Sequence, residues 1–80
     1  MKRVDDTDEL TDAEAESVAQ AIDIYRATPT SPWLFHPVPM RDERGRLCEV
    51  RFFADDTLQR PLAAIRIADD GALAPIEDLR

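Results

Sequence analysis

The amino-acid sequence predicts a small α+β domain, in which an N-terminal amphipathic helix packs on an antiparallel meander sheet. Three observations support this class. Apolar residues first recur at helical spacing, the apolar period then changes to two, and short polar runs separate the later apolar segments. We expect the helix over about residues 12–27 and three or four strands, at about 33–40, 47–54, 62–68 and 72–76.

The predicted helix has clear signals at both ends. Thr11 with Glu14 three residues later forms a capping-box pattern at the start. Pro29 disfavours helical backbone at the residue before it, so the helix should end there. One face carries the apolar residues Ala15, Val18, Ala21, Ile22 and Tyr25. We expect this face to pack on the sheet.

The first predicted strand, 33–40, contains Pro37 and Pro39 two residues apart. Alternate residues of a strand direct their N–H groups to the same side, so both missing donors fall on one edge. We therefore predict an edge strand whose outer side is blocked by proline. Its inner side should pair with 47–54 across the polar turn 41–46.

The last two predicted strands, 62–68 and 72–76, are joined by the sequence Asp-Asp-Gly. Gly71 can adopt the positive φ that tight hairpins require. A two-residue and a three-residue turn both fit and give different registers. Pro75 marks the last strand as an edge or as the end of a strand.

The predicted sheet has more apolar surface than one helix covers. Trp33 and Phe35 share one face of the first strand, whereas Val38 lies on the other. The adjacent residues Phe52 and Phe53 also point to opposite faces. We expect a dimer mate, a partner protein or the Pro-rich connector to cover the second face. Alternatively, Trp33 and Phe35 simply complete a small core.

Length and composition limit the organisation and the partners. Eighty residues suit a flexible acidic tail over 1–10 and a single domain over 11–80. The net charge of −7 disfavours direct binding of nucleic acid and of anionic membranes. No apolar run predicts a membrane span or a signal peptide. A single cysteine fits a reducing compartment, so we expect a cytoplasmic protein.

The sequence offers few groups for catalysis or for metal binding. His36 and Cys48 are the only residues of their types, and a Cys–His pair also needs a third, orienting group. One histidine and one cysteine are too few for zinc, and the paired aspartates are typical of turns. We therefore predict no enzyme, no cofactor and no metal. The arginines of 41–51 alternate with acidic residues, which favours internal pairing or a solvated turn over an RNA site.

Three hypotheses of function follow, in order of preference. The first is a small acidic, non-catalytic protein–protein interaction module (a regulator, an inhibitor or an accessory subunit), with a homodimer also in keeping with a small core. It would bind through an apolar sheet face around Trp33, Phe35 and Phe53. The second is a nucleic-acid mimic that blocks a DNA- or RNA-binding protein. Its acidic residues, which could also steer a protein partner, would be Asp5, Asp6, Asp8, Glu9, Asp12 and Glu16. The third is a small enzyme or enzyme subunit with an interface site containing His36 and Cys48.

Overall fold

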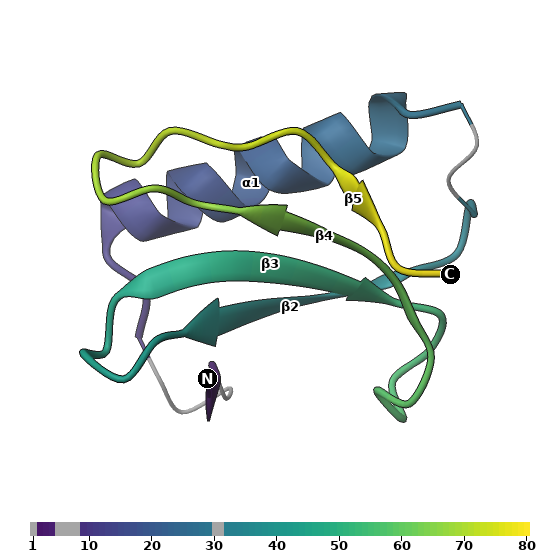
Figure 1. The fold of residues 1–80 in the computed structure, drawn as a ribbon, viewed down its shortest axis with the longest axis horizontal. Helices are drawn as coiled ribbons and strands as arrows, with labels where there is room; N and C mark the ends of the chain where they lie inside the picture. The colour runs from purple at the N-terminus through teal and green to yellow at the C-terminus, as the bar shows by residue number, and fades with distance from the viewer. Residues whose placement is uncertain (1, 5–8, 30–31) are drawn as a thin grey trace.

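The computed structural model describes residues 2–4, 9–29 and 32–80, with one helix packed on one face of an antiparallel sheet (Figure 1). The elements, in chain order, are β1 (Lys2–Arg3), α1 (Asp12–Ala27), β2 (His36–Arg41), β3 (Leu47–Phe53), β4 (Pro61–Arg66) and β5 (Glu77–Asp78). The strands lie in the sheet in the same order as in the chain, and all pairs are antiparallel. The predicted α+β class is confirmed, with five strands in place of three or four.

Helix α1 begins and ends where the sequence predicts. The Thr11 hydroxyl accepts a hydrogen bond from the Glu14 amide at 3.1 Å, and the Glu14 carboxylate accepts one from the Thr11 amide at 3.0 Å. The predicted capping box is therefore formed. At the other end, the Thr28 hydroxyl donates a hydrogen bond at 2.9 Å to the carbonyl of Ile24, in the last turn of the helix.

Two residues of the predicted tail belong to the sheet. Lys2–Arg3 form β1, which pairs with Met40 and Arg41 of β2. The Val4 amide also donates to the Pro39 carbonyl at 2.9 Å. The prediction that β2 is an edge strand is therefore wrong. A proline removes a donor but leaves its carbonyl free to accept, so pairing reaches Pro39 and the added strand stays short.

Strand β2 begins three residues later than predicted, at His36. His36 pairs with Phe53, which is the last residue of β3. Residues 33–35 therefore have no strand beside them, and the chain bends at 33 and 34. A strand extends only as far as its partner does, and for this reason the predicted span is too long.

Both hairpin turns that contain glycine have the same design. In the β2–β3 turn, the Asp42 amide donates to the Arg46 carbonyl at 2.9 Å, and Gly45 has a φ of +82°. After β4, the Ala68 amide donates to the Ala72 carbonyl at 2.9 Å, and Gly71 has a φ of +87°. The second turn thus contains three residues, which resolves the register that the sequence left open.

The predicted strand 72–76 is wrong in its position. Leu73 forms only an isolated bridge with Ile67, and the ladder breaks around Pro75. Proline cannot donate to a ladder, so regular pairing resumes beyond it, in β5 beside β4.

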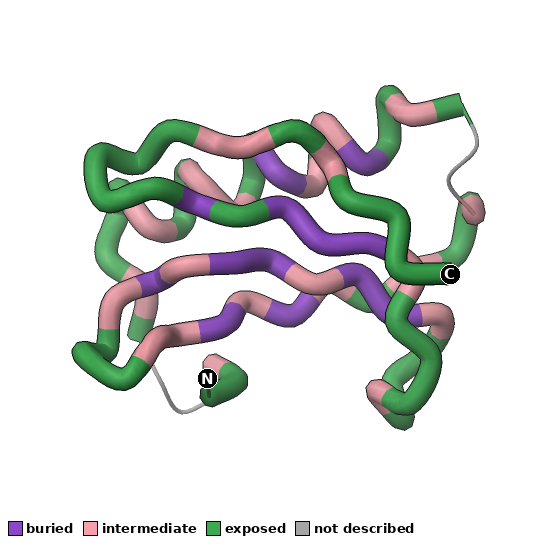
Figure 2. Tube along the Cα trace, in the orientation of Figure 1, coloured by how far each residue is buried: buried purple, intermediate pink, exposed green. Residues whose placement is uncertain are grey.

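The main core lies between α1 and the sheet, and Figure 2 shows buried residues in both layers. The Tyr25 ring stacks on Phe52 with a centroid distance of 4.4 Å and an interplanar angle of 17°. Phe35 lies 4.4 Å from Tyr25, and Ile65 is fully buried beside them. Of the predicted apolar face of the helix, only Ala15 is exposed. The helix-side core is therefore aromatic at its centre.

A second, smaller apolar cluster lies outside this core. Val38, Met40 and Phe53 keep between 5% and 8% of their surface exposed. Leu58, from the loop between β3 and β4, packs against them. Leu58 has a φ of +59°, a conformation that is uncommon for a residue with a branched side chain. The chain's own β3–β4 loop thus contributes to the cover of this cluster, and it was not among the covers that we expected.

Candidate functional site

The connector between α1 and β2 presents two large apolar side chains to solvent. The Tyr25 hydroxyl donates to the Pro32 carbonyl at 3.1 Å, and the Phe35 ring packs against Tyr25. The described part of the connector next to β2, residues 32–35, is therefore held at both ends. Between these anchors, Trp33 is 91% exposed and Leu34 is 78% exposed. Side chains on a held backbone lose less freedom on binding than those on a loose one.

Leu34 also borders an open hollow of about 510 Å³ at this end of the molecule. Its lining includes the apolar residues Pro32, Pro61 and Leu62 together with the guanidinium-bearing Arg60. The surface therefore combines a projecting indole with a recess that a partner's side chain could enter. We call Trp33, Leu34 and this hollow the connector surface.

The structure separates the three aromatic residues that the sequence grouped on one face. Trp33 lies on the connector, and Phe35 packs in the helix-side core against Tyr25 and Phe52. Phe53 belongs to the second cluster and is 8% exposed. The expected common face of Trp33, Phe35 and Phe53 is therefore wrong. The period of two holds only within a strand, and the strand begins after residue 35.

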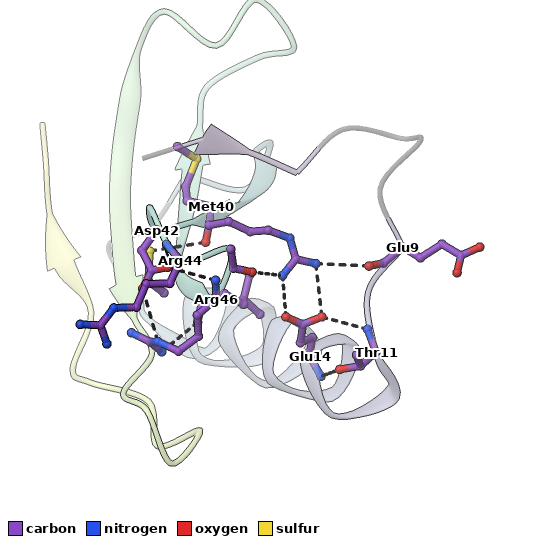
Figure 3. Close-up of polar contacts among 11 residues, drawn as sticks. Glu9, Thr11, Glu14, Met40, Asp42, Arg44 and Arg46 are labelled. Atoms are coloured by element: carbon purple, nitrogen blue, oxygen red, sulfur yellow. Dashed lines mark hydrogen bonds and ion pairs between the residues drawn. The ribbon is translucent and has the colours of Figure 1, made fainter.

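The acidic residues of the second hypothesis are described only in part. Asp5, Asp6 and Asp8 lie outside the described residues, whereas Glu9, Asp12 and Glu16 are exposed. Their neighbour Glu14, labelled in Figure 3, is paired: Arg41 Nη1 lies 2.7 Å from Glu14 Oε2. The Arg41 hydrogen bond, followed by that from the Thr11 amide, lowers the pKa of Glu14 from 4.5 to about 2. Arg41 thus offsets one negative charge of the first helical turn.

The single histidine and the single cysteine lie apart. His36 begins β2, whereas the Cys48 thiol donates to the carbonyl of Met40, near the other end of that strand. Four residues of strand span about 13 Å. Burial, together with nearby carboxylates, raises the pKa of the Cys48 thiol, which therefore stays protonated. Within one chain, His36 and Cys48 do not form the nucleophile–base pair of the third hypothesis.

The predicted internal pairing is confirmed for three arginines of the 41–51 segment. Arg46 Nε lies 3.5 Å from Asp42 and 3.0 Å from Asp69. Arg41 binds the helix, as described above, and Arg51 binds a carboxylate of its own strand. Three of the four arginines of this segment are therefore paired within the chain.

The face of the sheet away from α1, the open face, holds a charged network in which sequence reasoning missed Arg66. Glu49 is only 6% exposed, and its carboxylate lies 2.5 Å from Arg51 Nε and 4.0 Å from Arg66 Nε. Glu49 and Arg51 are two residues apart in an apolar strand, and this spacing already puts them on one face. Only the pairing of β3 with β4 adds Arg66, because it sets Arg66 opposite Glu49.

Among residues 2–4, 9–29 and 32–80, no three potential metal-binding side chains come together. Within the same described ranges, no helix has the length and the apolar composition needed to cross a membrane. The chain matches none of the protein-family models, curated proteins or solved structures with which it was compared.

Proposed function

We propose that this protein is a small, non-catalytic protein–protein interaction module that binds through the connector surface. It would serve as a regulator, an inhibitor or an accessory subunit. The observation that carries the proposal is the 91% exposure of Trp33 on the connector segment 32–35, which is held at both ends. Tryptophan is enriched among the few residues that dominate binding energy at interfaces. A solvated indole beside an exposed leucine is the apolar anchor that such an interface needs.

The expected energy of this anchor is substantial but not sufficient alone. An aromatic side chain buries about 200 Å² in an interface, which at 25 cal/mol per Å² corresponds to about 5 kcal/mol. Association itself costs roughly 4–15 kcal/mol of lost freedom. Trp33 would therefore be the centre of a larger contact that also involves Leu34 and the adjoining hollow.

The charge of the molecule favours a basic partner. A net charge of −7 accelerates the approach of a positively charged protein, an effect that salt screens beyond about 8 Å. The exposed carboxylates of Glu9, Asp12 and Glu16 would contribute to this steering. The cytoplasm is the compartment that we propose, because Cys48 is a free thiol.

The test compares the wild type with Trp33→Ala/Leu34→Ala in quantitative capture of host proteins on immobilised protein. The two residues touch solvent, so the variant should keep its fold and melt within about 2 °C of the wild type. Its loss of specifically captured protein would support the proposal. Capture of the same proteins in the same amounts by the folded variant would contradict it.

A matched control is Glu43→Ala/Arg44→Ala, which also truncates two long, exposed side chains. These residues lie in the β2–β3 turn, at the other end of β2 from the connector (Figure 1). The control should capture the same proteins as the wild type. Trp33 is the only tryptophan, so its fluorescence should shift to shorter wavelength when the captured partner is added. Light scattering shows whether that partner is a second copy of this chain.

Nucleic-acid mimicry has one supporting observation, the exposure of Glu9, Asp12 and Glu16. Arg41 neutralises Glu14 in the same region, which lowers the charge density that a mimic requires. The double variant Asp12→Lys/Glu16→Lys separates the two hypotheses. A mimic would lose its partner on this charge reversal and in high salt, whereas a Trp33-centred contact would persist in both.

A further inference from the structure

The open face contains a hollow that the proposed function does not use. It has a volume of about 590 Å³, within the range of small-molecule sites, and shares no lining residue with the hollow of the connector surface. Its lining comes from the β2–β3 turn, β3, β4 and the hairpin that follows β4. It includes Glu49, Arg51 and Arg66 together with Ala68, Ala72 and Ala74.

Small side chains along the hairpin make the hollow. Ile67 and Leu73, which pair across this hairpin, pack into the helix-side core. Because side chains alternate, Ala68, Ala72 and Ala74 fall on the opposite face, where the methyl groups leave space above the sheet. The hairpin therefore supplies an apolar shelf beside the arginines of β3 and β4.

Both arginines direct the Nε atom of the guanidinium group towards the Glu49 carboxylate. Arg51 Nε lies 2.5 Å from Glu49 Oε2, and Arg66 Nε lies 4.0 Å from Glu49 Oε1. No hydrogen bond of the terminal Arg51 nitrogens is found within the described part of the chain. Arg66 Nη2 is 3.8 Å from Glu77, in a pair of which both members are largely exposed. Such exposed pairs are weak, so a ligand can displace this one.

Stability alone does not account for the network. Glu49 sits opposite Met40 in β2 and is buried, so an apolar residue would suit the position. Glu49 is the buried member of these pairs, and the desolvation of its carboxylate offsets much of the attraction to the partly exposed arginines. What Glu49 does is orient two guanidinium groups while cancelling one of their two charges. Arg46 also borders the hollow, but Asp42 and Asp69 hold it.

We propose that this hollow binds a small organic carboxylate with an apolar body. The terminal nitrogens of Arg51 and Arg66 would donate to the carboxylate oxygens, since the guanidinium fork matches that planar group. The apolar body would lie on the shelf of Ala68, Ala72 and Ala74. Glu49 would stay between the two guanidinium groups, and the ligand carboxylate would take the place of the weakly held Glu77 on Arg66.

The test is a titration of the full chain with octanoate at constant ionic strength. Binding is measured through the changes in the NMR chemical shifts of the backbone amides. We expect saturable shifts confined to β3, β4 and the 67–74 hairpin. Arg66→Gln should weaken binding about tenfold or more, because it removes one charge-assisted contact. Arg44→Gln, which makes the same charge change on the exposed β2–β3 turn, should leave the affinity unchanged. Ala72→Phe should also abolish binding by filling the hollow while keeping every charge.

Several outcomes would overturn the proposal. Octanol binding as tightly as octanoate would show that the arginines are not used, and tighter binding of octyl phosphate would contradict the carboxylate class. Equal losses in Arg66→Gln and Arg44→Gln would indicate general charge attraction. No saturation by about 10 mM octanoate would exclude the site. Trp33→Ala/Leu34→Ala should keep the octanoate affinity, so this result is independent of the connector surface.

Discussion

The two faces of the sheet differ in which side chains they bury and in what covers them. The helix side is closed by α1 over the stacked rings of Tyr25 and Phe52. The open face has only a small apolar cluster, to which Leu58 adds, and next to it a buried carboxylate between two arginines. One face is therefore built for stability. The other tolerates charge, and it is where the ligand hollow lies.

The largest expected effect tests the helix side. Phe52→Ala removes a ring with no exposed surface and should cost about 3–5 kcal/mol of the free energy of unfolding. Phe53→Ala, its neighbour on the other face, should cost about 2 kcal/mol, because fewer atoms pack around it. Urea denaturation measures both. Equal losses would show that the two faces contribute alike, and Phe52→Leu serves if the alanine variant does not fold.

The next effect tests the charged network. Arg51→Met leaves the buried Glu49 carboxylate with only Arg66, at 4.0 Å, as a partner and should destabilise the fold by about 1–3 kcal/mol. The double variant Glu49→Met/Arg51→Met should return to within about 1 kcal/mol of the wild type, because both charges are then gone. The same denaturation experiment decides the issue. A double variant as unstable as the single one would mean that the pair itself stabilises the fold.

A smaller effect tests the loop residue of the second cluster. Leu58→Ala should cost about 1–2 kcal/mol, since it removes apolar contact with Val38, Met40 and Phe53. Leu58→Gly should be more stable than the alanine variant by about 1 kcal/mol, because glycine adopts the φ of +59° without strain. Thermal melts can rank the two variants. The opposite ranking would argue against a left-handed backbone at this residue.

The smallest effect tests how the helix is attached to the sheet. The pKa of Glu14 falls to about 2 in the folded state, chiefly through Arg41, so its contribution to stability is complete above pH 4.5. That contribution, about 1 kcal/mol after allowance for solvent screening, should disappear as the pH falls from 4.5 towards 2. Glu14→Gln should therefore lose stability at pH 7 but show a flatter acid profile. Parallel profiles for the two proteins would contradict this role.

The comparison also shows which parts of the site could be predicted. The exposure of Trp33 could not be predicted from the sequence. Trp33 lies two positions before Phe35, and within a continuous strand the two side chains would share one face of the sheet. The strand in fact begins at His36, opposite the end of β3. The Glu49–Arg51 spacing was visible in the sequence, whereas Arg66 joins them only through the β3–β4 register.

The sequence by itself determined the local features of this protein. The capping box at Thr11, the helix that follows it and the glycine turns depend on contacts within a few residues. The local sequence is therefore enough to predict them. Tertiary structure decided where strands begin and end and which side chains share a face. It also decided that β1 pairs with the proline-containing strand β2. Those outcomes depend on partners far away in sequence, whose register no local pattern specifies.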